Sequence, residues 1–217
     1  MKVTHYIDVL SSWCLIAEDG LARLRATHGA ALDYEWRIAW VKDGGPAAYS
    51  REQLAWYYGR TAAVTGVRLV PWVENSTSST APANLAAEAA RALGVTDERV
   101  RLALARAAML EGRPLGRREV AIEVAAAAGS LDPRALDAKM NDPKIERILR
   151  ENAATFAGLA AHGVDQRPTF VFENTVGDRV ILSGVWRHEP LAATAAGLLA
   201  DEGAYARFAA TTAPYPA

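Results

Sequence analysis

Strand-like segments stand at the two ends of this chain, and a long helical stretch separates them. Residues 3–10 and 32–41 are rich in β-branched and aromatic side chains, and the second segment alternates large apolar residues with charged ones. The same chemistry returns at residues 167–174 and 179–184, which a glycine-containing turn joins as a hairpin. Because a two-stranded sheet is marginal by itself, we expect the strands of both ends to share one sheet.

Helices are expected next to these strands. One follows the first strand at residues 14–27 and stops at Gly29, and another occupies residues 188–199 after the last strand. The alanine- and proline-rich tail, residues 208–217, is expected to be loosely held. The predicted order is therefore β-α-β, a helical insertion, and β-β-α.

The insertion covers residues 50–162, which are dominated by alanine and leucine. Ser50 and Gln53 have the spacing of a capping box, and Asp132 and Asp142 each precede a proline, which is typical of a helix start. A further start is expected at residues 96–98.

We therefore predict two domains in an α/β fold. Residues 1–45 and 163–217 form one domain with the shared sheet, and residues 46–162 form an inserted all-helical domain that packs over it.

Composition excludes several classes of function. Lys and Arg number 24 against 25 Asp and Glu, so the chain lacks the positive excess that binding to nucleic acid needs. No uninterrupted apolar run is long enough for a membrane span, and the N-terminus has no export signal. A single cysteine permits no internal disulfide, which fits a cytoplasmic protein, and the four histidines have no metal-ligand spacing.

The cysteine marks the candidate site. Cys14 stands where the first strand turns into the first helix, three residues after Ser11. If Ser11 is the N-cap, its hydroxyl accepts a hydrogen bond from the amide of Trp13 or Cys14. The backbone N–H groups and the positive end of the helix dipole then stabilise an anion or thiolate in the first helical turn.

These segments resemble a known superfamily. The stretch YIDVLSSWCLIAEDGLARL is similar to the strand, four-residue site and helix of the DsbA superfamily, and HGVDQRPTFVFEN is similar to its segment with a cis-proline. The resemblance is to the cytoplasmic branch, which contains FrnE-like oxidoreductases, 2-hydroxychromene-2-carboxylate isomerases and kappa-class glutathione transferases. It implies a thioredoxin-like fold with a large all-helical insertion.

The resemblance also implies roles for individual positions. Ser11 stands at the place of the nucleophile and Cys14 at that of the resolving cysteine, while Ser12 replaces the family's proline. Pro168 matches the cis-proline, and Arg167 would offer its backbone to an extended ligand.

Further along the chain, Trp186 and Arg187 stand where relatives bind the γ-glutamyl end of glutathione. Arg187 could pair with a carboxylate of that ligand.

Because a dithiol cycle needs two sulfurs, an internal C-x-x-C reaction is not expected. The resemblance implies instead that glutathione is the cofactor and that Ser11 donates a hydrogen bond to its sulfur. The sulfur of glutathione then reacts with a small electrophilic or aromatic substrate. Two alternatives remain: a thiol-disulfide oxidoreductase that acts on thiol proteins or glutathione through Cys14 alone, and a non-catalytic module that binds a peptide beside Pro168.

Structural roles also remain open for these residues. Ser11 is a common helix cap in any fold, Cys14 is a common small core residue, and Trp13 fits either a ligand wall or plain packing. A surface position suits Arg187 equally well. The sequence leaves both a monomer and a homodimer open.

Overall fold

One four-stranded sheet joins the two ends of the chain in the computed structural model, which describes residues 1–47 and 49–212. Its strand order is β2 (Asp33–Ile38), β1 (Lys2–Ile7), β3 (Thr169–Glu173) and β4 (Arg179–Ser183). Strand β1 is parallel to β2 and antiparallel to β3, and β3 is antiparallel to β4. The prediction of one shared sheet is confirmed.

The strands β1 and β2 are shorter than the apolar runs that predict them. Strand β1 ends at Ile7 because the next residue, Asp8, bends the chain: its carboxylate accepts the backbone N–H of Leu10 at 2.9 Å. The same carboxylate accepts the N–H of Val41 at 2.8 Å, just beyond the end of β2 and at the start of the short helix η2 (Val41–Gly44).

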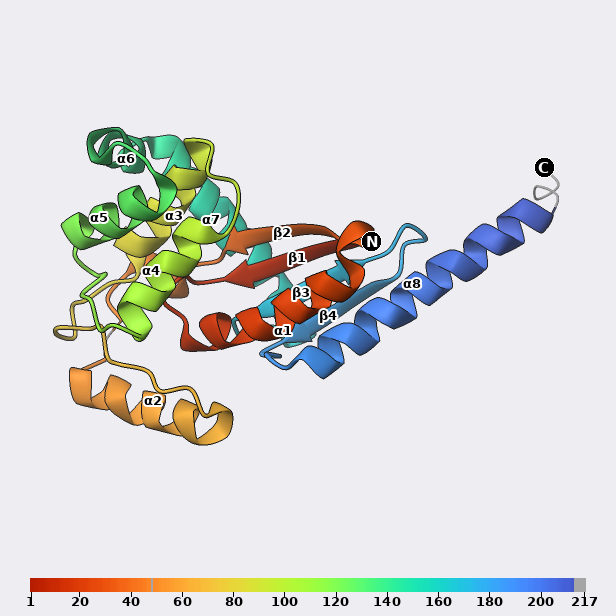
Figure 1. Cartoon of the computed structure of the whole chain (residues 1–217), viewed down its shortest axis with the longest axis horizontal. Coiled ribbons are helices and arrows are strands. Elements are labelled where there is room, and N and C mark those ends of the chain that lie inside the picture. The colour runs from red at the N-terminus through yellow and green to blue at the C-terminus, as the bar shows by residue number, and fades with distance from the viewer. Residues whose placement is uncertain (48, 213–217) are drawn as a thin grey trace.

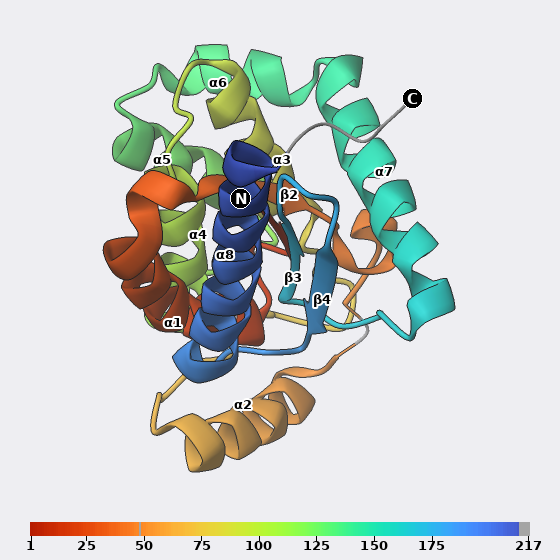
Figure 2. The same ribbon diagram turned by 90° about the vertical axis from the view of Figure 1, so that its right-hand side faces the viewer.

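Helices cover both faces of the sheet. Helix α1 (Ser12–His28), followed by η1 (Gly29–Ala31), lies beside helix α8 (His188–Thr211) on one face, as Figure 2 shows. Leu21 and Leu24 of α1 and Leu191 of α8 are buried there against Phe170 and Phe172 of β3. Helix α7 (Pro143–Ala157) and η3 (Gly158–His162) cover the other face, so the sheet lies between two helical layers and its central strands β1 and β3 are largely buried.

The remaining helices follow β2 and gather at one end of the sheet, except α2, which stands apart (Figure 1). They are α2 (Arg51–Thr65), α3 (Ala81–Ala92), α4 (Arg99–Met109), α5 (Arg118–Gly129) and α6 (Pro133–Met140). Asp132 and Asp142 cap α6 and α7 with their side chains, and Ser50 and Gln53 form the predicted capping box of α2. Helix α4 begins directly after the predicted start at residues 96–98.

The last helix is longer than predicted. It runs to Thr211 rather than ending near residue 199, because alanine recurs through residues 200–210 and no proline interrupts the chain there. Figure 1 shows its second half extending away from the sheet, and Tyr205 and Phe208 are exposed there. The expected loose tail is therefore helical up to Thr211, and residues 213–217 lie outside the described residues. No described helix has the length and apolar character needed to cross a bilayer.

Candidate active site

The site is built around a buried carboxylate at the end of β1. Asp8 is fully buried, and beside the two backbone N–H groups its Oδ2 accepts hydrogen bonds from Thr80 Oγ1 and Asn84 Nδ2, both at 3.0 Å. Asn84 in turn accepts the N–H of Val9 at 3.0 Å. Asp8 thereby ties the strand ends to the start of α3, and this fixes the turn that leads into α1.

Ser11 is the N-cap of α1, and Ser12 and Trp13 are its first helical residues, as predicted. The predicted capping bond is wrong, because the Ser11 side chain accepts no hydrogen bond from the helix backbone. The Ser11 side chain therefore has no bond to the helix backbone, and the residue is partly exposed. The N–H groups of the first turn lie beside it with the positive end of the helix dipole.

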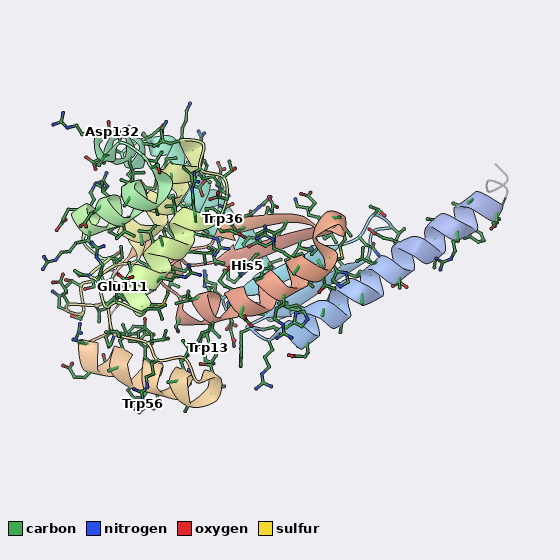
Figure 3. All side chains as sticks on the ribbon, in the orientation of Figure 1. His5, Trp13, Trp36, Trp56, Glu111 and Asp132 are labelled. Carbon is green, nitrogen blue, oxygen red and sulfur yellow. The ribbon has the colours of Figure 1, made fainter. Side chains whose placement is uncertain are left out.

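A cavity of about 310 Å³ opens beside this helix end. Ser11, Ser12 and Trp13 line one side, and Leu54, Tyr57 and Tyr58 of α2 line the opposite side. Figure 3 shows Trp13 at the end of α1 that lies nearest to α2. The volume lies within the range of small-molecule sites.

The lining of this cavity is mainly aromatic and aliphatic. Trp72, near the middle of the connector between α2 and α3, lines it and is buried. Tyr49 lines it from the segment before α2 and is more exposed. Two cations, Lys42 and Arg60, line the cavity as well.

Cys14 does not line this cavity. Its side chain is only 4% exposed and belongs to the core behind the first turn. Burial raises the pKa of the Cys14 thiol to about 12, and this outweighs the opposite effects of the Ser11 side chain and the Asp8 backbone. The thiol therefore stays protonated at neutral pH, whereas thiol chemistry needs a thiolate.

The bond between Arg167 and Pro168 is cis, the geometry that the resemblance implies. The Arg167 guanidinium donates to the carbonyl oxygens of Ala39 and Trp40 and lies 4.3 Å from the ring centre of Phe156. Burial lowers the pKa of Arg167, although Asp8 acts in the opposite direction. No backbone hydrogen bond of the described part of the chain uses the N–H or C=O of Arg167, while the Pro168 carbonyl accepts the N–H of Gly184.

Trp186 and Arg187 lie beside the site rather than in the cavity of Ser11. The rings of Trp186 and Trp13 are 6.2 Å apart, and both Trp186 and Arg187 line a separate cavity of about 410 Å³. Gly20 makes this placement possible, because a Cβ there would lie 3.0 Å from the backbone of Trp186 and His188. Of the predicted binding residues, Ser11, Ser12 and Trp13 thus share one cavity, and Trp186 adjoins it through Trp13.

Sequence reasoning missed the α2 side of the cavity and the partners of Asp8. Tyr57 and Tyr58 gave no signal because two adjacent tyrosines fit neither a clear apolar helix face nor a motif. Thr80 and Asn84 are too far along the chain from Asp8 for any local pattern to relate them.

A mixed four-stranded sheet with two covering helical layers, a site at the first helix N-terminus and an insertion after β2 defines a thioredoxin fold with a helical insertion. The model of one family, the DSBA-like thioredoxin domain, matches residues 2–195. The chain belongs to this family. A search of curated protein sequences found no match.

Solved structures agree in fold. The cytosolic disulfide reductase DsbM from Pseudomonas aeruginosa, solved also with GSH, has a TM-score of 0.66 and 24% identity over 88% of this chain and 93% of its own. A candidate protein disulfide isomerase from Nitrosomonas europaea has a TM-score of 0.73 and 16% identity over 92% and 98%. A 2-hydroxychromene-2-carboxylate isomerase has a TM-score of 0.62 and 18% identity over 94% and 98%.

Proposed function

We propose that this protein is a glutathione-dependent isomerase or transferase in which the Ser11 hydroxyl donates a hydrogen bond to the sulfur of bound glutathione. The observation that carries the proposal is the contrast at the start of α1. Ser11 lines a cavity and has no capping bond, while Cys14 is buried in the core.

The chemistry follows from the surroundings of Ser11. A thiol with a pKa of about 8.5 is mostly protonated at neutral pH, and a hydroxyl donor together with a helix N-terminus favours its thiolate. The thiolate attacks an electrophilic carbon and forms the S–C bond, and the displaced electron pair leaves with a leaving group or moves onto a conjugated carbonyl oxygen. In the isomerase case the addition is reversed after bond rotation, and glutathione is released unchanged.

The first turn of α1, the segment at Pro168 and the neighbouring cavity of Trp186 would hold the rest of the ligand. The free backbone N–H and C=O of Arg167 next to Pro168 would pair with the peptide part of glutathione, as in strand addition. Ser12 and Trp13 would contact the ligand near its sulfur, and Trp186 and Arg187 would hold its γ-glutamyl end. DsbM solved with GSH supports a glutathione site in this fold.

Calorimetric titration with glutathione tests the proposal. We expect the wild-type protein to bind, Ser11→Ala to bind about 10- to 100-fold more weakly, and Cys14→Ala to bind as the wild type does, since a charge-assisted hydrogen bond contributes about 1.5–3 kcal/mol. Absence of binding to the wild type would reject glutathione as the cofactor. Loss of binding on Cys14→Ala alone would favour the alternative, a thiol oxidoreductase that forms a mixed disulfide.

The disulfide reductase among the structural neighbours keeps that alternative in view, but the burial of Cys14 disfavours it. A non-catalytic module that binds a peptide beside Pro168 is the third candidate, and it requires that Ser11→Ala leave every activity unchanged. We propose a cytoplasmic location on the single cysteine and the cytosolic neighbour. The division into a domain of residues 1–45 and 163–217 and an inserted domain of residues 46–162 stays a proposal.

A further inference from the structure

The side of the cavity opposite Ser11 carries a row of charges and rings. Lys42 Nζ lies 5.7 Å from the ring centre of Tyr49, the rings of Tyr49 and Tyr57 are 5.3 Å apart, and the guanidinium carbon of Arg60 lies 5.7 Å from the ring centre of Tyr57. All four residues line the cavity. We call Lys42, Tyr49, Tyr57 and Arg60 the cation-ring row.

The cations of this row have no acidic partner. Within residues 1–47 and 49–212, neither Lys42 nor Arg60 forms a salt bridge, and Lys42 Nζ donates only to the carbonyl oxygen of Ala47 at 3.2 Å. Asp8 is the one acidic residue among the described residues that line the cavity, and protein donors occupy both of its carboxylate oxygens. The side chains that face a ligand therefore carry net positive charge, which favours an anion.

The backbone at Lys42 is also unusual. Lys42 and Asp43 both have φ of 50° and ψ of 36°, the left-handed conformation that residues other than glycine rarely adopt, and Gly44 follows with φ of 75°. Such conformations persist where the surroundings fix them, and they cluster at ligand-binding sites.

Neighbouring contacts hold this segment from both sides. The Val41 N–H is bonded to Asp8, the carbonyl oxygen of Trp40 accepts from Arg167, and the carbonyl oxygen of Gly44 accepts from Ser79 Oγ. A Cβ on Gly44 would lie 3.0 Å from the Trp40 ring, and this close approach together with the φ of 75° favours glycine there. The segment is thus held in a conformation that places the Lys42 side chain at the cavity.

We propose that the cation-ring row binds a planar aromatic or conjugated anion, with its rings on the flat part of the ligand and Lys42 or Arg60 on its anionic group. An ammonium or guanidinium group forms charge-assisted hydrogen bonds with such a group, and tyrosine rings pack against a planar ligand. The inference rests on the proposed function, because this ligand is the electrophile that reacts with glutathione held at Ser11. The carboxylates of glutathione are a second source of the same chemistry, and the test separates the two.

Binding of cinnamate and of its uncharged counterpart cinnamyl alcohol, followed by calorimetry without glutathione, tests the row. We expect the wild-type protein to bind cinnamate about tenfold more tightly than the alcohol, in line with the free energy of a hydrogen bond to a charged group. Lys42→Gly and Arg60→Met should each reduce this preference. Asp43→Gly is the matched control, because it removes the same left-handed strain without removing a cavity cation, and it should keep the preference.

Thermal unfolding of the same variants separates binding from structure. Lys42→Gly and Asp43→Gly should both keep or raise the melting temperature, since glycine adopts the left-handed conformation readily. A Lys42 whose role is structural would instead lose stability together with binding.

Equal affinity of the wild type for the two probes would overturn the inference. So would a Lys42→Gly variant and an Arg60→Met variant that lose affinity for glutathione but keep the cinnamate preference, because the cations would then serve the carboxylates of glutathione. Failure of the wild type to bind glutathione would reject the proposed function. The cinnamate preference would still decide whether the cation-ring row binds a planar anion, because that measurement uses no glutathione.

Discussion

The two sides of the cavity are held in different ways. On the α1 side, Asp8 accepts four hydrogen bonds and joins the turn before α1 to the start of η2 and the start of α3, and Cys14 and Leu10 are buried beneath the helix start. On the α2 side, the helix stands apart from the other elements in Figure 1, and Trp56 is 64% exposed on the side of α2 that faces away from α1 in Figure 3.

The attachments of α2 are correspondingly few. Leu54, Tyr58 and Thr61 are its buried residues, and Arg51 donates to the carbonyl oxygen of Val73 at 3.4 Å. A wall with few contacts opens at low free energy, whereas a wall fixed by buried hydrogen bonds opens only with the whole fold. The contrast suits a fixed site for the sulfur of glutathione and an adaptable wall for the second substrate.

Removal of the Asp8 carboxylate is the largest expected perturbation. Asp8→Ala leaves Thr80, Asn84 and two backbone N–H groups without their acceptor, so we expect a loss of about 3 kcal/mol or more in the free energy of unfolding. Urea denaturation measures it. Trp56→Ala, on the exposed side of α2, is the comparison and should change stability by less than about 0.5 kcal/mol. Similar losses in both variants would remove the distinction between the two walls.

Stability at alkaline pH depends on the buried thiol. Because burial raises the pKa of Cys14 to about 12, the unfolded chain loses the thiol proton at a lower pH than the folded protein does. Between the ordinary thiol pKa of about 8.5 and the folded value of about 12, the folded state binds more protons than the unfolded state. The free energy of unfolding therefore falls as pH rises through this range. Cys14 contributes a slope of at most about 1.4 kcal/mol per pH unit.

Urea unfolding between neutral pH and pH of about 11 measures this slope, and Cys14→Ala isolates it from the titration of tyrosines and lysines, which both proteins share. The wild type should lose stability more steeply than the variant. Parallel curves would mean that the thiol is not buried in solution, and the thiol oxidoreductase would then regain support.

The two N-cap serines are expected to behave oppositely. Ser50 accepts the N–H of Gln53 at 3.2 Å within its capping box, so Ser50→Ala should cost about 1 kcal/mol of stability and leave glutathione binding unchanged. Ser11 has no capping bond, so Ser11→Ala should change stability by less than about 0.5 kcal/mol while it weakens glutathione binding. Thermal denaturation and calorimetry on both variants provide the comparison. A destabilised Ser11→Ala variant with normal binding would make Ser11 a structural cap.

Local patterns predicted the parts of the fold that depend on neighbouring residues. Three of these local patterns are present in the structure. They are the β-branched and aromatic run at residues 169–173, the aspartates before Pro133 and Pro143, and the capping box of Ser50. The position of Ser11 at a helix start was predictable for the same reason.

Features that depend on distant residues were not predictable. The bonds of Asp8 to Thr80 and Asn84 span 72 and 76 residues, so no pattern near Asp8 announces them. The left-handed backbone at Lys42 is likewise held by contacts with residues far away in the sequence, such as Asp8, Arg167 and Ser79. The residues next to Lys42 in the sequence do not reveal these contacts. The capping bond predicted for Ser11 is absent, because a serine at the N-cap can accept such a bond but need not do so.

Proton release on glutathione binding tests the central claim most directly. Calorimetric titrations at pH of about 7 in two buffers of different ionisation enthalpy count the protons released when glutathione binds. The thiol of glutathione has a pKa of about 8.5 in water and is mostly protonated at this pH. If Ser11 and the α1 N-terminus favour the thiolate, most bound glutathione molecules should have released the thiol proton. The account predicts this release for the wild type and for Cys14→Ala, and a much smaller release for Ser11→Ala. Binding without proton release, or a release that depends on Cys14 instead of Ser11, would contradict it.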